Sequence, residues 1–151
     1  SWGARGLLTY MLSRPNDWKF NVSHLLKQSE LDGEYALRRM MKELDRALEL
    51  KPDHLDALSA RGTLLVRLPC LLGGDPEKGE QVLRQVIQRE PAAVNARISL
   101  AKSYCKRGRH QDAVVLASEA LTLAKAQQLD DFIPEASKVV AQLHTVGNKG
   151  N

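Results

Sequence analysis

The sequence predicts an all-α protein built from stacked pairs of antiparallel helices, and three observations support this. Apolar residues recur at helical spacing along most of the chain, and the alternating pattern of strands is absent. Related positions recur at one fixed offset and then at a shorter one, which indicates internal repeats. Prolines and glycines fall between the periodic segments, where they end helices and form turns.

The composition is that of one globular domain over residues 1–151. A chain of this length is most simply a single domain, and 43% hydrophobic with 26% charged residues is ordinary for that class. Aromatic residues make up only 5%, so the core is expected to consist of Leu, Ala, Val and Ile. The net charge is +4, but basic and acidic residues are interleaved, so we expect no nucleic-acid partner. No apolar run approaches the roughly 20 residues that span a membrane, and no signal peptide is visible.

The two cysteines give no sign of a metal site. Cys70 and Cys105 form no C-x-x-C and have no histidine at metal spacing, so we expect free thiols and, as the default, a cytoplasmic location. The chain begins at Ser1 without a methionine, so we expect a processed protein or a piece of a longer one. A periplasmic location after removal of a signal segment is therefore an open alternative.

The first two predicted helices lie at the N-terminus. A helix over residues 3–14 ends at Pro15, because the residue before a proline disfavours helical backbone. A second helix over 17–29 starts at a capping Asn16 or Asp17 and carries a candidate core residue, Trp18. The remaining helices are expected over residues 34–50, 54–68, 76–89, 92–107, 110–125 and 132–146.

Start signals and apolar stripes place these later helices. Asp75 followed by Pro76 combines a capping carboxylate with a proline at the first helical position, and Asp53 and Pro134 mark two other starts. The stripes at helical spacing predict core residues rather than a cofactor pocket. These residues are Leu37, Met40, Met41, Leu44, Ala47 and Leu48, then Val82, Val86 and Ile87, and finally Val114, Ala117, Ala120 and Leu121.

The two repeat offsets locate an insertion. Gly62 and Ala101 are equivalent positions in successive first helices, and Gly79 and Ala113 are equivalent positions in successive second helices. The first pair is separated by more of the chain than the second pair. The extra residues must therefore lie between the two helices of the middle unit. The segment 69–75 contains a proline and two adjacent glycines there, so it is predicted to be a loop.

The third unit resembles the tetratricopeptide repeat (TPR) family. Its matching residues are Leu100, Ala101, Tyr104, Gly108, Ala113 and Ala120: a large then a small residue, an aromatic, a turn glycine and two second-helix alanines. The unit departs from the family at Arg97, Ala117 and Lys125, where a tryptophan, an aromatic and a proline are usual.

The resemblance implies a right-handed superhelical stack of antiparallel helix pairs, a TPR-like α-solenoid of about three repeats. Small residues would let the helices approach closely, Tyr104 would fill the space between units, and Gly108 would permit the turn. The implied boundaries are an N-terminal helix (1–16), repeat 1 (17–52), repeat 2 (53–91) with its inserted loop, repeat 3 (92–125) and a capping helix (132–147).

No catalytic or cofactor motif accompanies this pattern. The nucleophile elbow, zinc-protease, P-loop and dinucleotide fingerprints are all missing. The histidines His24, His54, His110 and His144 are scattered, and none has a ligand one helical turn away. We therefore expect neither an enzyme nor a bound cofactor or metal.

The resemblance implies a concave groove, lined by the first helix of each unit, that receives a peptide or helix of a partner. The family's groove positions fall on Asp56, Ser59, Thr63 and Arg67 in repeat 2 and on Asn95, Ser99, Lys102 and Lys106 in repeat 3. Most are polar or cationic, so an acidic segment or a C-terminal carboxylate would suit them. The expected function is a non-catalytic scaffold or adaptor. The alternative for these eight residues is that they are merely exposed polar side chains.

Two other functions remain open. The insertion Leu-Gly-Gly-Asp-Pro-Glu-Lys over residues 72–78 resembles one found in some bacterial TPR proteins, including lipoproteins associated with solute transporters. That likeness implies a bacterial origin and a solute-binding accessory protein of a transport system, with a cavity near the 69–75 loop. The third possibility is a regulatory module of a larger enzyme.

Overall fold

The computed structural model describes residues 37–147, and the side chains of residues 37–143. This part is helical without strands, which confirms the all-α prediction there. The predicted helices over 3–14 and 17–29, with Trp18, lie outside the described residues. A helix occupies residues 37–50. It is followed by α3 (Leu55–Arg67), the 3-10 helix η1 (Cys70–Leu72), α4 (Pro76–Arg89), α5 (Val94–Lys106), α6 (His110–Ala126) and α7 (Ile133–Gly147).

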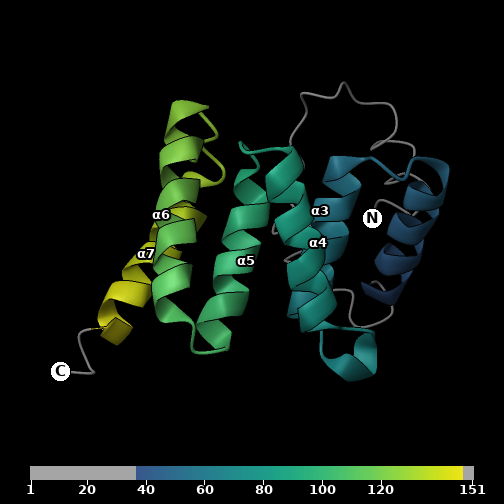
Figure 1. The fold of residues 1–151 in the computed structure, drawn as a ribbon, viewed down its shortest axis with the longest axis horizontal. Coiled ribbons are helices and arrows are strands. Elements are labelled where there is room, and N and C mark those ends of the chain that lie inside the picture. Colours follow the sequence, from purple (N-terminus) through teal and green to yellow (C-terminus); the bar gives the residue numbers. More distant parts are fainter. Residues whose placement is uncertain (1–36, 148–151) are drawn as a thin grey trace.

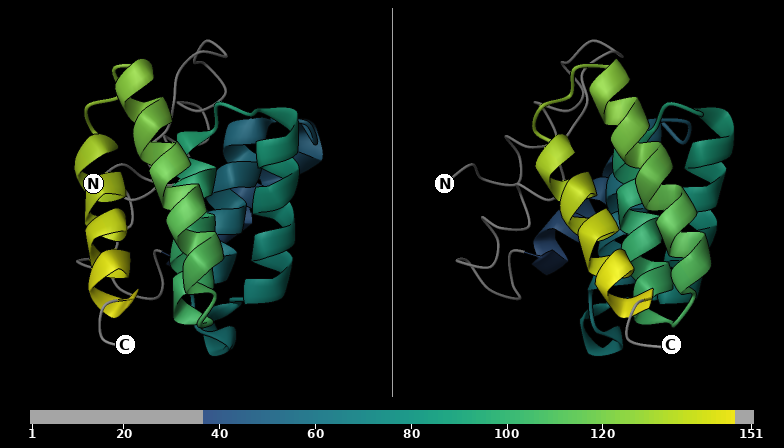
Figure 2. Two further views of the ribbon diagram at one scale, coloured as in Figure 1. Left: turned by 60° about the vertical axis from the view of Figure 1, so that its left-hand side comes forward. Right: turned by 90° about the vertical axis from the view of Figure 1, so that its left-hand side faces the viewer.

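Consecutive helices are antiparallel and pack side by side (Figure 1). The α3 helix packs along α4, and α5 packs along α6. The α5 helix also contacts α3 and α4, and α7 packs against α6 and α5 (Figure 2). The helices α3, α5 and α7 therefore run in the same direction, with their N-termini at the upper end in Figure 1.

Two glycines bring the backbones of α3 and α4 close together. A Cβ atom on Gly79 would lie 2.6 Å from Val66 Cγ1 and 2.9 Å from the carbonyl oxygen of Gly62. A Cβ on Gly62 would lie 2.9 Å from Leu83 Cγ. Carbon atoms need more than 3 Å, so neither position has room for a side chain. The small residues predicted from the repeat offsets are thus buried where two helices touch.

Alanines allow the same close approach of helices in the later part of the chain. Ala113, Ala117, Ala120 and Ala124 follow one face of α6 at helical spacing, and each is 0% exposed. Their small side chains let α5 and α7 pack closely on α6. The larger members of this cluster come from α4, α5, α7 and the turn before α7; they include Val86, Ile98, Leu100, Tyr104, Phe132, Val139 and Leu143.

A second cluster joins the helix over 37–50 to α3. Its buried members are Leu44, Ala57, Ala60, Leu64 and Leu68. The predicted stripe of this helix is confirmed, since Leu37, Met40, Met41 and Leu48 are partly buried against the cluster.

The start of α4 follows the predicted signal. The Asp75 carboxylate accepts a hydrogen bond of 3.0 Å from the backbone N–H of Lys78, and Pro76 is the first helical residue. The prediction for Asp53 was wrong by one residue: His54 caps α3, and its Nδ1 accepts from the N–H of Ala57 at 3.4 Å. The Asp53 carboxylate instead accepts a hydrogen bond from Arg89, because the exposed turn leaves it free to reach the end of α4.

The predicted loop over 69–75 contains η1 and folds back on the end of α3. The N–H of Asp75 donates to the carbonyl oxygen of Leu65 at 3.0 Å. Gly74 lies so close to this backbone that a Cβ would be 1.9 Å from the Leu68 oxygen, and Gly73 has a left-handed φ of 87°. Both glycines are therefore explained by the turn.

Replacing Asp75 with alanine should lower the free energy of unfolding by about 1 kcal/mol, since the first turn of α4 loses its side-chain acceptor. Urea unfolding followed by circular dichroism at 222 nm measures this. The exposed Glu49, changed to alanine, is the control and should stay within about 0.5 kcal/mol of the wild type. Equal stability of both variants would contradict the capping role.

Candidate functional site

The eight predicted groove residues all lie on α3 and α5, which pack together. Three of them, Ser59, Thr63 and Ser99, are buried. The Thr63 hydroxyl donates to Ser99 Oγ at 2.9 Å, and Asn95 Nδ2 donates to Ser59 Oγ at 3.5 Å. These bonds join the two helices. The alternative prediction was that all eight are merely exposed polar residues. It is wrong for Ser59, Thr63 and Ser99, because these side chains lie buried between α3 and α5.

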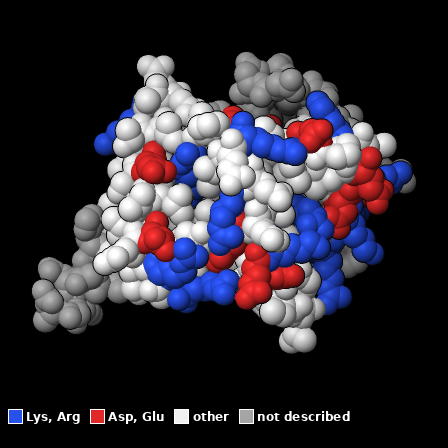
Figure 3. Space-filling view, viewed as in Figure 1, with Lys and Arg blue, Asp and Glu red and all other residues white. Residues whose placement is uncertain are grey.

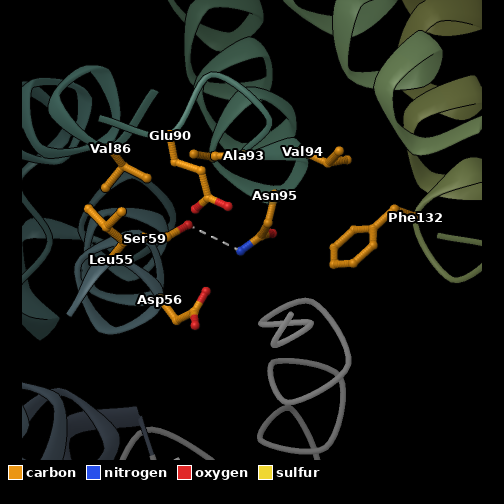
Figure 4. A pocket seen from close by; sticks show the side chains of 10 residues that line it. Leu55, Asp56, Ser59, Val86, Glu90, Ala93, Val94, Asn95 and Phe132 are labelled. Carbon is orange, nitrogen blue, oxygen red and sulfur yellow. Dashed lines mark hydrogen bonds between the residues drawn. The ribbon is translucent and has the colours of Figure 1, made fainter. Parts of the chain in front are cut away.

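A small pocket, which we call the Glu90 pocket, lies at the N-terminal ends of α3 and α5. Figure 4 shows the carboxylates of Asp56 and Glu90 on either side of the Ser59–Asn95 hydrogen bond, with Phe132 across the pocket. Its volume is about 30 Å³, which is enough for one water molecule. Asn95 Oδ1 is buried and has no hydrogen-bond partner among the described residues.

A larger pocket, the Lys106 pocket, lies at the other end of the same helices. Its volume is about 280 Å³, and α3, α5 and α7 all contribute to its wall. Three cations line it: the predicted Arg67, Lys102 and Lys106. Apolar side chains complete the wall, including Val66, Val139 and Leu143. Seven of the eight predicted residues thus line one of the two pockets, and the fully buried Thr63 lies between them.

The cations of the Lys106 pocket differ in their partners. Lys102 forms an ion pair with Glu135 of α7, which ties α5 to α7. Among the described residues, Arg67 and Lys106 form no ion pair, and Lys106 is exposed. Two of the three positive charges are therefore available to an incoming anion.

A buried carboxylate that the sequence reasoning missed supports the floor of the Lys106 pocket. The Glu80 side chain on α4 is 4% exposed. Its Oε1 accepts a hydrogen bond of 2.8 Å from the hydroxyl of Ser103, a wall residue of the pocket. Its Oε2 accepts from Arg84 at 3.1 Å, and Arg107 lies 3.5 Å from Oε1. The carboxylate thus holds α4 and α5 in register.

Tyr104 of α5 extends this network toward α4. Its ring is buried, and its hydroxyl accepts a hydrogen bond of 2.9 Å from Arg84. The guanidinium of Arg109 lies 3.8 Å from the ring centroid, which is a cation–π contact. The hydrogen bond to Asp112 raises the pKa of Arg109 from its ordinary value.

Arg97 lies at a position where the resemblance to the TPR family leads us to expect a tryptophan. It is 8% exposed, and its charge is neutralised by Glu119, whose carboxylate accepts from Arg97 Nε at 3.1 Å. A second bond of 3.4 Å reaches the carbonyl oxygen of Ala93. The ion pair with Glu119 therefore allows a charged side chain to be buried at this position.

The face shown in Figure 3 carries both signs of charge side by side rather than one continuous basic field. Ion pairs join Arg107 to Glu77 and Arg109 to Asp112. Within residues 37–143, no group of three or more metal-ligating side chains could hold a metal ion. The thiols of Cys70 and Cys105 are free.

Comparisons with protein-family models, curated proteins and solved structures found no significant match. The function must therefore be argued from the geometry of the two pockets. None of the helices in the described part of the chain is both long and apolar enough to cross a membrane.

Several wall residues were not predicted. Glu90 lies in the turn after α4, and Phe132 lies in the turn before α7. Val139 and Leu143 lie on α7, which was predicted only as a capping helix. The longer of the two repeat offsets pairs Val139 and Leu143 with Leu100 and Tyr104 of α5, so it marked them as packing positions and not as groove positions.

Proposed function

We propose that this protein is a non-catalytic interaction module, a TPR-like α-solenoid whose groove along α3, α5 and α7 binds an acidic segment of a partner protein. The antiparallel helix pairs and the buried small residues at Gly62, Ala101 and Ala113 support the solenoid arrangement. The right-handed superhelix and the membership of the TPR family are parts of this proposal. The choice between cytoplasm and periplasm does not alter it.

The observation that carries the proposal is the Lys106 pocket. Arg67, Lys102 and Lys106 surround an apolar floor, and the pocket opens between three helices. Cationic side chains next to apolar surface suit a carboxylate with a neighbouring apolar side chain, since charge-assisted hydrogen bonds and burial of apolar area then act together. Binding of such a group is therefore the function that these side chains support best.

The Lys106→Glu variant tests this function. It should weaken the partner recovered by pull-down about tenfold or more, because a cation that meets the acidic segment becomes an anion. Titration of that partner in a calorimeter measures the change, and the circular dichroism spectrum should match that of the wild type.

The matched control is Lys78→Glu, which makes the same charge change at an exposed site on α4 outside both pockets. It should bind as the wild type does. If Lys106→Glu and Arg67→Glu both retained full affinity, the assignment of the groove would be wrong.

A second candidate is a solute-binding accessory protein of a transport system. The observation in its favour is the position of the cavity of about 280 Å³, whose wall includes Val66 and Arg67 just before the inserted loop. That volume approaches the range of small-molecule sites, and the three cations would select an anionic solute. Native mass spectrometry of the purified protein tests this: a bound small anion would favour the candidate, and its absence from protein purified from its natural source would count against it.

A further inference from the structure

The charges of the groove are segregated along its length. The Glu90 pocket is lined by two carboxylates, Asp56 and Glu90, and by no Lys or Arg among the described residues. The Lys106 pocket is lined by three cations and by no described carboxylate. The groove therefore has an acidic end and a basic end, although the chain as a whole carries only a net charge of +4.

The two ends are close enough for one short segment to reach both. Asn95 and Lys106 mark the two pockets on the same helix, and at about 1.5 Å per residue α5 separates them by about 16 Å. An extended peptide advances about 3.3 Å per residue, so about five residues span this distance. A segment of six or seven residues can therefore contact both pockets at once.

The acidic end also offers groups that accept hydrogen bonds. Asn95 Oδ1 has no partner among the described residues, and the Glu90 carboxylate points toward the same amide in Figure 4. A buried acceptor without a donor is costly, so a ligand that supplies N–H groups there is favoured. The ammonium group of a lysine or of an amino terminus would supply both the donor and the opposite charge.

From this segregation we infer that the groove binds a segment of mixed charge in one orientation, an inference that rests on the proposed function. An ammonium group, which is about the size of the one water molecule for which the Glu90 pocket has room, lies in that pocket. An acidic residue beside an apolar one lies about five residues away in the Lys106 pocket. The reversed orientation places carboxylate against carboxylate and cation against cation, so like-charge repulsion excludes it.

Selection from a phage-displayed library of random ten-residue peptides, at low ionic strength, tests the inference. The wild-type protein should enrich sequences in which an acidic residue is adjacent to an apolar one and a basic residue lies four to six positions away. We expect this spacing to be enriched about threefold over the unselected library, given the modest strength of partly exposed ion pairs.

The charge-swapped protein, Glu90→Lys with Lys106→Glu, is the decisive variant. Asp56 then offsets the new cation in one pocket, and Arg67 and Lys102 still face the new anion in the other. The variant should therefore lose the preference for a distant basic residue and keep only a weakened preference for the acidic one. Circular dichroism checks that it folds, and the single variants Glu90→Gln and Lys106→Gln replace it if it does not. Each should lose the preference for one charge only.

The possible outcomes distinguish failure of the mixed-charge inference from failure of the proposed function. Enrichment of an acidic and apolar motif without any preference for a distant basic residue would overturn the inference and leave the proposed function standing. A motif that the charge swap does not change would also overturn it. If no motif is enriched at all, the proposed function itself fails.

Discussion

Replacing Gly79 with alanine should lower the free energy of unfolding by about 3 kcal/mol, although alanine is the better helix former. The added methyl group would lie 2.6 Å from Val66 Cγ1 and 2.9 Å from both Leu65 Cβ and the carbonyl oxygen of Gly62. Two of these three atoms belong to the backbone or are fixed to it. The contact therefore cannot be relieved by a rotamer change, and α3 and α4 must move apart. Urea unfolding followed at 222 nm measures the loss.

Gly108→Ala is the matched control for this variant. Gly108 ends α5 with a left-handed φ of 77°, and a Cβ there would meet nothing within 4 Å. The substitution adds the same methyl group and costs only the backbone strain, about 1 kcal/mol. If the Gly79 variant were no less stable than the Gly108 variant, the close approach of α3 and α4 would be wrong.

Replacing Glu80 with alanine should cost about 2 kcal/mol. The buried hydroxyl of Ser103 loses its acceptor, and a charge-assisted hydrogen bond from Arg84 disappears. The arginines Arg84 and Arg107 are 44% and 42% exposed, so they can turn toward water, which keeps the loss below that of a fully buried ion pair. Chemical denaturation measures the change in midpoint.

Two comparisons make this result specific. Glu77→Ala removes a carboxylate that is 84% exposed from the same helix and should change stability by less than about 0.5 kcal/mol. In a double-mutant cycle, Ser103→Ala should recover part of the loss caused by Glu80→Ala, because no orphaned hydroxyl remains. Additive effects of the two substitutions would show that these side chains do not interact.

The sequence allowed the helices of the described part to be predicted within about two residues, and for local reasons. Asp75 and Pro76 give α4 its start, and Gly108 gives α5 its end, because each residue acts on the backbone next to it. The repeat offsets added a longer-range result: they placed Gly79 and Ala113 at equivalent buried positions.

The environment of single polar residues could not be predicted in this way. Glu80 lies in a segment rich in charged residues, which is typical of a solvent-exposed helix face. Only the packing of α5 on α4 buries its carboxylate against Ser103. The sequence analysis placed the hydroxyls of Ser59 and Ser99 in the groove. In the structure, Ser59 of α3 is hydrogen-bonded to a side chain of α5, and Ser99 of α5 to a side chain of α3. Such contacts depend on the rotation of one helix against another, which a single sequence does not specify.

The order in which the helices touch has a consequence for how the chain folds. Every extensive contact among α3, α4, α5, α6 and α7 joins helices that are neighbours along the chain or are separated by one helix. Segments that meet in the native state are therefore never far apart in the unfolded chain, and little entropy is lost in closing the loops between them. Such low contact order is typical of domains that fold in microseconds to milliseconds, before exposed apolar faces have time to associate.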